Sequence, residues 1–110
     1  MAIATLTKRQ GVNIGYYYEE TIADGTNGDT IKIPPLQEGA SVTCTIESSG
    51  NTGKVQFTTS SDADVTAGTE TWQDWPSGNV TATTTDRIVS PVTGVRGVSV
   101  SGEVVFQVIV

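Results

Sequence analysis

The sequence contains no histidine and only one cysteine, Cys44. Without histidine, Ser-His-Asp and Cys-His catalysis and histidine-ligated zinc are excluded. A single cysteine cannot close an internal disulfide. Cys44 lies in an alternating stretch, residues 41–46, with no basic neighbour in sequence, so we expect a small buried hydrophobe rather than a nucleophile.

Basic residues are also scarce, with 6 Lys and Arg against 12 Asp and Glu, a net charge of -6. This balance argues against nucleic acid or an anionic membrane as the main partner. No apolar run approaches the roughly 18–20 residues of a spanning helix, and residues 1–9 lack the apolar core of a signal peptide. We therefore expect a soluble protein made in a cytosol.

The residues that are present indicate β structure. A chain of 110 residues predicts one domain. Apolar residues alternate with polar ones at 31–33, 42–46 and 54–58, as they do in half-buried strands. At 103–110 the chain is apolar on nearly both faces, which predicts a central strand or one covered by a partner subunit. We expect strands near residues 2–7, 12–22, 29–33, 41–47, 54–60, 69–73, 80–89, 92–100 and 103–110.

Turn signals separate these runs at intervals of about 8–12 residues, a pattern typical of a sandwich or small barrel. The sequence thus predicts an all-β protein, with residues 1–110 forming one β-sandwich of about 8 antiparallel strands. Alternation does not encode strand order, so jelly-roll-like and immunoglobulin-like topologies both stay open. Residues 1–10 could form an N-terminal arm, and residues 60–68 fit one capped helical turn or a compact loop.

Four carboxylates lie within thirteen residues: Asp62, Asp64, Glu70 and Asp74. An Asp-x-Asp pair could supply two oxygens to calcium, but the Gly and distal Glu of a calcium loop are missing. Solvated carboxylates on a capped turn are the alternative. Nothing distinguishes a pair for glycoside hydrolysis either. We therefore predict no metal, no cofactor and no enzymatic activity.

Five of the seven aromatic residues fall in two groups, Tyr16, Tyr17 and Tyr18, and Trp72 with Trp75. On a strand, Tyr16 and Tyr18 share one face and Tyr17 takes the other. These side chains could pack in the core or at its edge, anchor a protein interface, or stack on sugars.

Arg96 lies inside the strand pattern of residues 92–100. Its planar guanidinium could pair with a carboxylate within the fold or across subunits. An exposed strand position is the alternative.

Residues 54–110 carry a series of motifs: KVQFTTSS at 54–61, TAGT at 66–69, TWQDWPSG at 71–78, SPVTGVRGV at 90–98 and VSGEVVFQVI at 100–109. This series resembles small virion structural proteins of tailed bacteriophages, over about half of the chain. One departure is that Gly94 and Gly97 flank Val95 and Arg96 where larger residues would be expected. The glycines predict a bulge or a close backbone approach.

The resemblance implies a non-enzymatic capsid decoration, or cement, protein on the surface of a virion that assembles in the host bacterial cytoplasm. Its implied partners are the major capsid protein and copies of itself, with a trimer favoured. The expected contacts are the arm residues Ile3, Leu6, Lys8 and Arg9, together with Tyr16, Tyr17, Tyr18, Trp72, Trp75 and Arg96.

A second hypothesis is a tail or fibre module that binds a host surface glycan, with the tryptophans and tyrosines as exposed stacking platforms. A weaker third is an inhibitor-like or metal-binding β-domain.

Overall fold

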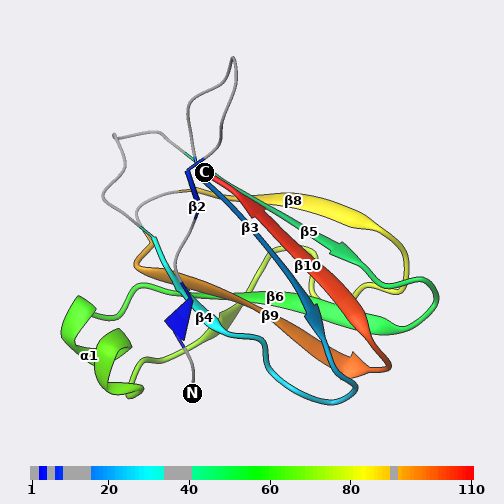
Figure 1. The fold of residues 1–110 in the computed structure, drawn as a ribbon, viewed down its shortest axis with the longest axis horizontal. Helices are drawn as coiled ribbons and strands as arrows, with labels where there is room; N and C mark the ends of the chain where they lie inside the picture. The colour runs from blue at the N-terminus through cyan, green and yellow to red at the C-terminus, as the bar shows by residue number, and fades with distance from the viewer. Residues whose placement is uncertain (1–2, 5–6, 9–15, 34–40, 90–91) are drawn as a thin grey trace.

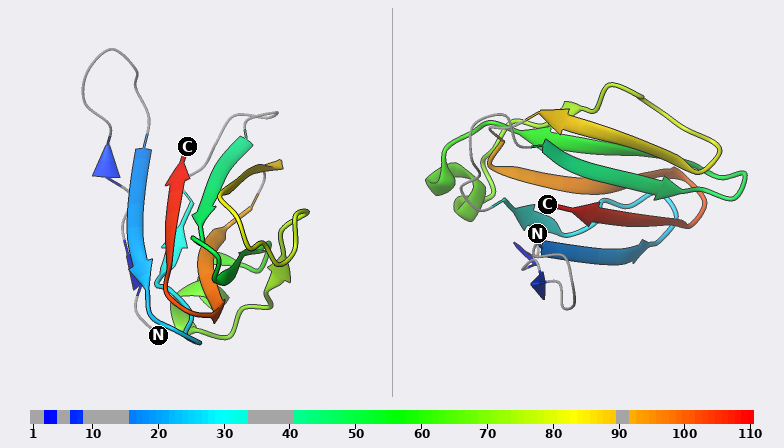
Figure 2. Two further views of the ribbon diagram at one scale, coloured as in Figure 1. Left: turned by 90° about the vertical axis from the view of Figure 1, so that its right-hand side faces the viewer. Right: turned by 90° about the horizontal axis from the view of Figure 1, so that it is seen from above.

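The computed structural model describes residues 3–4, 7–8, 16–33, 41–89 and 92–110. These residues form two β-sheets packed face to face, with one short helix at one end (Figure 1). In the right-hand view of Figure 2 the strands β8, β5, β10 and β3 lie side by side, with strands of the other sheet behind them. The predicted all-β sandwich is confirmed.

Each layer contains five strands among the described residues. Sheet A has the order β1-β4-β9-β6-β7. Its strands are β1 (Ile3–Ala4), β4 (Thr30–Lys32), β9 (Gly94–Ser101), β6 (Thr52–Thr58) and β7 (Gln73–Asp74). Sheet B has the order β2-β3-β10-β5-β8. Its strands are β2 (Thr7–Lys8), β3 (Tyr16–Ile22), β10 (Val104–Ile109), β5 (Ser41–Glu47) and β8 (Thr84–Val89).

The strand order distinguishes between the two topologies that the sequence left open. From β3 to β10 the chain crosses to the other sheet at every connection except that between β6 and β7. Immunoglobulin-like sandwiches instead keep several consecutive strands paired within one sheet. Without the two-residue strands β1 and β2, each sheet has four antiparallel strands, and two such sheets connected in this alternating way form a jelly roll.

The core fills the space between the sheets. Along β5 the buried and partly exposed positions alternate, so that Val42, Cys44 and Ile46 point inward. On β10 Phe106 is fully buried, and this strand is central in sheet B between β3 and β5. The expectation of a central or covered C-terminal strand is confirmed by its central position.

Gly97 on β9 permits a close approach between the sheets. A Cβ placed there would lie 2.5 Å from Ile22 Cδ1 and 2.6 Å from Phe106 Cβ. Real Cβ atoms do not come so close to other heavy atoms, because the core is packed at the density of a solid. The predicted close approach is confirmed. The alternative, a bulge at these glycines, is not seen, because the register shift of the β6–β9 pair lies between Thr52 and Gly53.

The single described helix, α1 (Asp62–Ala67), lies in the segment for which the sequence allowed a capped helical turn or a compact loop, and the helical alternative is the one observed. Ser61 is its N-cap, and the Ser61 side chain accepts a hydrogen bond from the Asp64 backbone N–H. The helix ends at Gly68, whose φ of 77° is left-handed. Lys32 connects it to sheet A, since Lys32 Nζ lies 2.8 Å from Asp62 Oδ1.

Side-chain hydrogen bonds link three turns at the opposite end of the sandwich. Asp24 Oδ1, between β3 and β4, accepts a hydrogen bond of 2.7 Å from Gly102 N in the β9–β10 turn. Asn51, between β5 and β6, donates from Nδ2 to Glu103 O at 2.9 Å. These bonds tie turns from both sheets into one unit.

Candidate interaction surface

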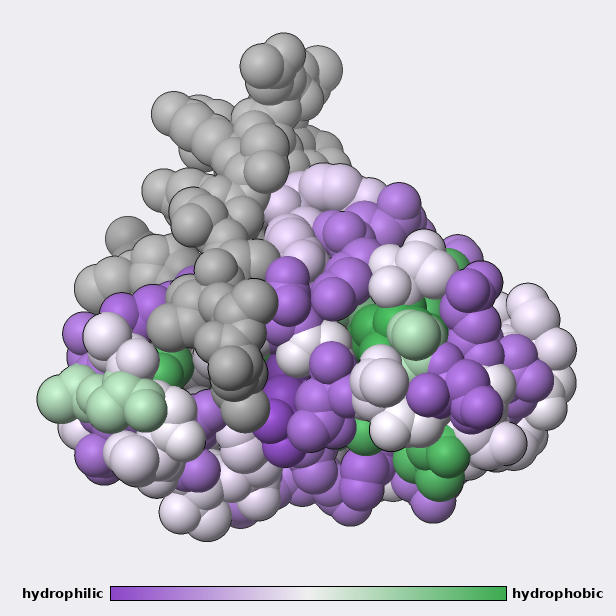
Figure 3. Space-filling view, turned by 60° about the horizontal axis from the view of Figure 1, so that its bottom comes forward, coloured by the Kyte–Doolittle hydropathy of each residue, from purple (hydrophilic) through white to green (hydrophobic). Residues whose placement is uncertain are grey.

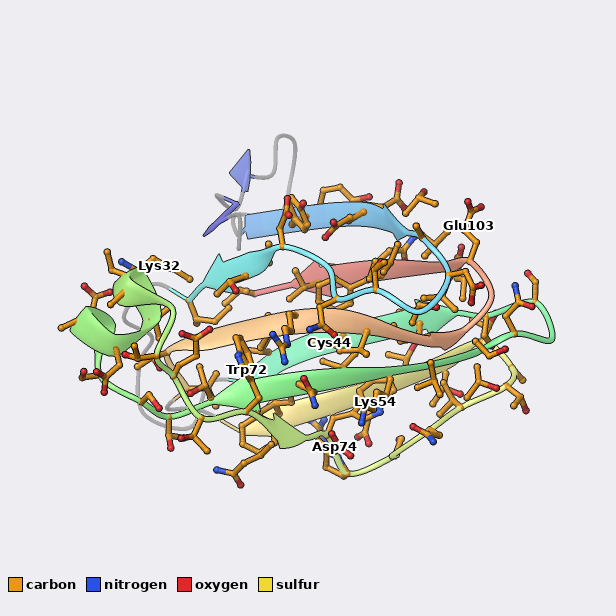
Figure 4. The ribbon with its side chains drawn as sticks, turned by 90° about the horizontal axis from the view of Figure 1, so that it is seen from below. Lys32, Cys44, Lys54, Trp72, Asp74 and Glu103 are labelled. Carbon is orange, nitrogen blue, oxygen red and sulfur yellow. The ribbon has the colours of Figure 1, made fainter. Side chains whose placement is uncertain are left out.

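The predicted contact residues do not form a single site. Trp72 and Arg96 lie on the outer face of sheet A, and Tyr17 lies on the outer face of sheet B, on the other side of the sandwich. Figure 4 looks onto sheet A from outside, with Trp72, Lys54 and Asp74 labelled.

Arg96 packs flat against Trp72. The guanidinium carbon is 4.3 Å from the centroid of the indole ring, within range of a cation–π interaction. Arg96 Nε and Nη2 donate to Gln56 Oε1 at 2.9 and 2.7 Å. Gln56 is the cross-strand partner of Arg96, so the β6–β9 register brings these two side chains together.

The contacts continue across the sheet to its edge. Gln56 Nε2 donates to Asp74 Oδ1 at 3.0 Å, and Lys54 Nζ lies 3.1 Å from the same oxygen. Trp72 Nε1 donates to Glu70 Oε1 at 3.0 Å. We call this set the Trp72–Arg96 cluster: Lys54, Gln56, Glu70, Trp72, Asp74 and Arg96.

Within this cluster Arg96 is the buried member and Asp74 an exposed one. Arg96 is only 8% exposed, and desolvation lowers the pKa of its guanidinium, while Glu70 opposes that change. The hydrogen bond from Gln56 and the contact with Lys54 lower the pKa of Asp74. Arg96 therefore pairs within the fold, mainly with an amide and a ring, and not at an exposed strand position.

Trp75 corrects the expected interface. Its side chain is 2% exposed and belongs to the core. The indole Nε1 donates to Gly78 O at 2.7 Å, and the backbone N–H donates to Val55 O. Because both donors are satisfied internally, Trp75 packs the sandwich and does not reach a partner.

On sheet B, Tyr17 and Tyr18 point to opposite faces, as predicted. Tyr17 pairs with Ile109 and is partly exposed on the outer face. Burial and the negative charges of Glu19 and Glu47 raise its pKa. Tyr18 packs against the core, and its pKa is raised to about 12, first by burial.

The expected arm residues are described only in part. Ile3 pairs with Thr30 in sheet A, and Lys8 pairs with Tyr16 in sheet B, so both belong to strands of the domain. Leu6 and Arg9 lie outside the described residues.

The four neighbouring carboxylates have separate partners. Asp62 pairs with Lys32 and Asp74 with Lys54. Asp64 Oδ1 accepts from Thr69 Oγ1, and Glu70 Oε1 accepts from Trp72 Nε1. No group of three or more metal-ligating side chains occurs in the part of the chain that the structure describes.

Cys44 is fully buried, which confirms the predicted role as a small hydrophobe. Burial raises the pKa of the thiol to about 12, with a smaller contribution from Asp86. A thiol with such a pKa is not a nucleophile at neutral pH.

The sequence did not single out the polar partners of these residues. Gln56 and Glu19 are surface positions in strand patterns, and Arg87 lies in a Thr-rich run. Their importance comes from cross-strand register, which pairs Gln56 with Arg96 and Thr43 with Arg87. A sequence signal existed only for Gln56, which alternates with Val55 and Phe57 in the strand pattern of residues 54–58.

A scan against protein-family models gave no match, and a search of curated proteins likewise gave none. Within the described residues, no helix is both long and apolar enough to cross a membrane.

Proposed function

We propose that the protein is a non-enzymatic structural component of a phage virion, and specifically a capsid decoration protein that binds the outside of the head and stabilises it. The motifs at residues 54–109 suggested this role. The jelly-roll topology supports it, since viral capsid domains are among the proteins that use this fold.

The observation that carries the proposal is how the reactive side chains are used. Arg96 and Asp74 are joined through Gln56, Lys54 pairs directly with Asp74, and the thiol of Cys44 is buried. The surface that remains consists of sheet faces and polar turns. In the view of Figure 3 it is mostly hydrophilic, with small hydrophobic patches. Such a surface suits contact with another protein rather than chemistry.

The test is stoichiometry in purified virus particles, measured by quantitative mass spectrometry against the major capsid protein. A copy number close to that of the capsid protein is expected for a decoration protein. Adding the protein back to shells that lack it should raise their melting temperature, because a ligand that binds only the native shell stabilises it. Complete absence from particles would refute the virion role.

The second candidate is a glycan-binding module of the tail or its fibres. Trp72 favours it, because the indole is partly exposed and donates a hydrogen bond to Glu70, and lectin domains also use the jelly roll. Arg96 opposes it, because the guanidinium already covers one face of the ring.

Tryptophan fluorescence separates the candidates. A glycan that stacks on Trp72 would quench emission in the native protein and not in Trp72→Phe, since Trp75 is buried. A handful of copies per particle, together with such quenching, would favour the tail role. The decoration role predicts no quenching across a broad glycan set.

A further inference from the structure

The outer face of sheet B is a second surface, distinct from the Trp72–Arg96 cluster. Residues of β10, β3, β5 and β8 that alternate with the core positions build it, and cross-strand pairing aligns them in rows. We call this surface the sheet B outer face: Tyr17, Glu19, Thr21, Thr43, Thr45, Glu47, Thr85, Arg87, Val105, Gln107 and Ile109.

Ile109 is an apolar side chain on the middle strand of this face, at the C-terminal end of β10. It is 39% exposed, and only Val100 matches it among the exposed large hydrophobic residues that the structure describes. In its row, Tyr17 lies on one side and Thr43 on the other, both partly exposed. An exposed branched residue among such neighbours would lose unfavourable hydration if another surface covered it.

Two opposite charges lie on either side of Ile109. Glu19 is exposed on β3, and its Oε2 accepts a hydrogen bond from Gln107 Nε2 at 2.6 Å. Arg87 is exposed on β8, two strands away from Ile109 in the other direction. Neither side chain has an ion pair among the described residues, where the ion pairs are those of Lys32 and Lys54.

The register makes the arrangement self-complementary. Arg87 is two strands from Ile109, about 10 Å, and Glu19 is one strand across and two residues along, about 8 Å. These two distances are similar. Consider a two-fold axis that lies in the plane of the face, passes through Ile109 and bisects the angle between the directions from Ile109 to Glu19 and from Ile109 to Arg87. Rotation about this axis places Glu19 of each copy opposite Arg87 of the other. A two-fold interface uses the same patch on both subunits.

We propose that a second copy of this chain binds the sheet B outer face across a two-fold axis at Ile109, with each Glu19 opposite the other copy's Arg87. Each dimer then contains two reciprocal ion pairs around a central Ile109–Ile109 contact. This pairing is two-fold and does not give the trimer that the sequence favoured. It does not depend on a virion role.

Glu47 opposes the pairing. Glu47 lies four residues along β5 from Thr43. Seen from Ile109, its direction falls between those of Glu19 and Arg87, so Glu47 lies close to the two-fold axis. The two copies of Glu47 come near one another, where like charges repel. The face also has only about eleven side chains per copy, against roughly 20–30 residues a side in a standard interface. The dimer is thus weak and depends on concentration.

Charge reversal tests the pairing. Sedimentation equilibrium of the full chain is measured for wild type, for Glu19→Arg, for Arg87→Glu and for an equimolar mixture of the two variants. Each variant alone places like charges at both contacts, so its dimer dissociation constant should rise about tenfold or more. In the mixture every contact is again between opposite charges, so a heterodimer should form with near-wild-type affinity.

Glu103→Arg is the matched control, because it makes the same change in net charge in the β9–β10 turn, off the face, and should leave dimerisation unchanged. Circular dichroism checks that each variant is folded. Glu47→Gln should strengthen the dimer. The proposal is overturned by a wild type that stays monomeric at millimolar concentration, by single variants that dimerise like wild type, or by a mixture that stays monomeric.

Discussion

At the scale of single residues, Arg96 holds together the side chains on the outer face of sheet A. Its guanidinium contacts Trp72 and Gln56, and Gln56 in turn contacts Asp74. A lysine could supply the charge, but it lacks the planar group that stacks on the indole and donates two hydrogen bonds at once. The identity of this residue is thus set by geometry more than by charge.

Arg96→Ala should lower the free energy of unfolding by about 2–4 kcal/mol, because it removes a buried cation–π contact and two hydrogen bonds. Arg96→Lys should fall between this variant and wild type. Lys54→Ala is the control, since its ion pair is more exposed and should contribute less than about 1 kcal/mol. Urea denaturation followed by fluorescence measures all three. Equal losses for Arg96→Ala and Lys54→Ala would contradict the argument.

Gly97→Ala tests the close approach of the two sheets. The added methyl would meet Ile22 and Phe106 Cβ, and the latter cannot rotate away. We expect a loss of about 1–3 kcal/mol from overpacking. Gly94→Ala is the matched control on the same strand, where the nearest atom is Thr58 Cγ2 at 3.3 Å. Thermal unfolding should show a clearly larger decrease in melting temperature for Gly97→Ala than for Gly94→Ala.

At the scale of elements, Ser61 determines where α1 begins. Ser61→Ala removes the acceptor for the Asp64 N–H and should cost about 1 kcal/mol. Ser61→Asp keeps an acceptor and should retain most of the stability. Since the helix is short and lies at one end of the sandwich, amide hydrogen exchange of residues 62–67 is the sensitive measurement. Exchange in Ser61→Ala no faster than in Ser61→Asp would argue against the capping role.

The sequence predicted where strands and the helix lie along the chain better than it predicted which strands pair with one another. Alternation located β5, β6 and β10, and the Ser and Gly at its ends located α1. No local sequence pattern records which strands pair when they are distant in the chain. The order of the strands in each sheet and the Gln56–Arg96 contact could therefore not be predicted. Trp72 and Trp75 looked equivalent because they share one motif, yet one is partly exposed and the other is core.

At the scale of the whole molecule, Glu20 links the two layers where β3 gives way to β4. Its carboxylate accepts from Asp29 N at 3.0 Å, while Asp29 Oδ2 accepts from Tyr18 Oη. Burial is the main cause that raises the pKa of Glu20, and the charge of Asp29 adds to it, although the bond from the Asp29 N–H opposes the change. The ionised form is therefore less favourable in the folded protein than in the unfolded chain.

A raised pKa in the folded state means that Glu20 stabilises the fold at low pH and that this stabilisation is lost as the pH rises through the folded-state pKa. Glu20→Gln removes the charge and keeps an oxygen that can accept from Asp29 N, so it should raise the melting temperature slightly at pH 7. Below the ordinary pKa of 4.5 both proteins carry a neutral side chain, and the difference should vanish. Asp74→Asn should behave in the opposite sense, because the pKa of Asp74 is lowered: its stabilisation of the fold is complete above the ordinary value of 3.8 and is lost as the pH falls through the folded-state pKa. Melting temperatures of the three proteins between pH 3 and pH 8 measure both effects. A Glu20→Gln variant less stable than wild type at pH 7 would mean that the charge of Glu20 holds the layers together, against the sign argued from its burial.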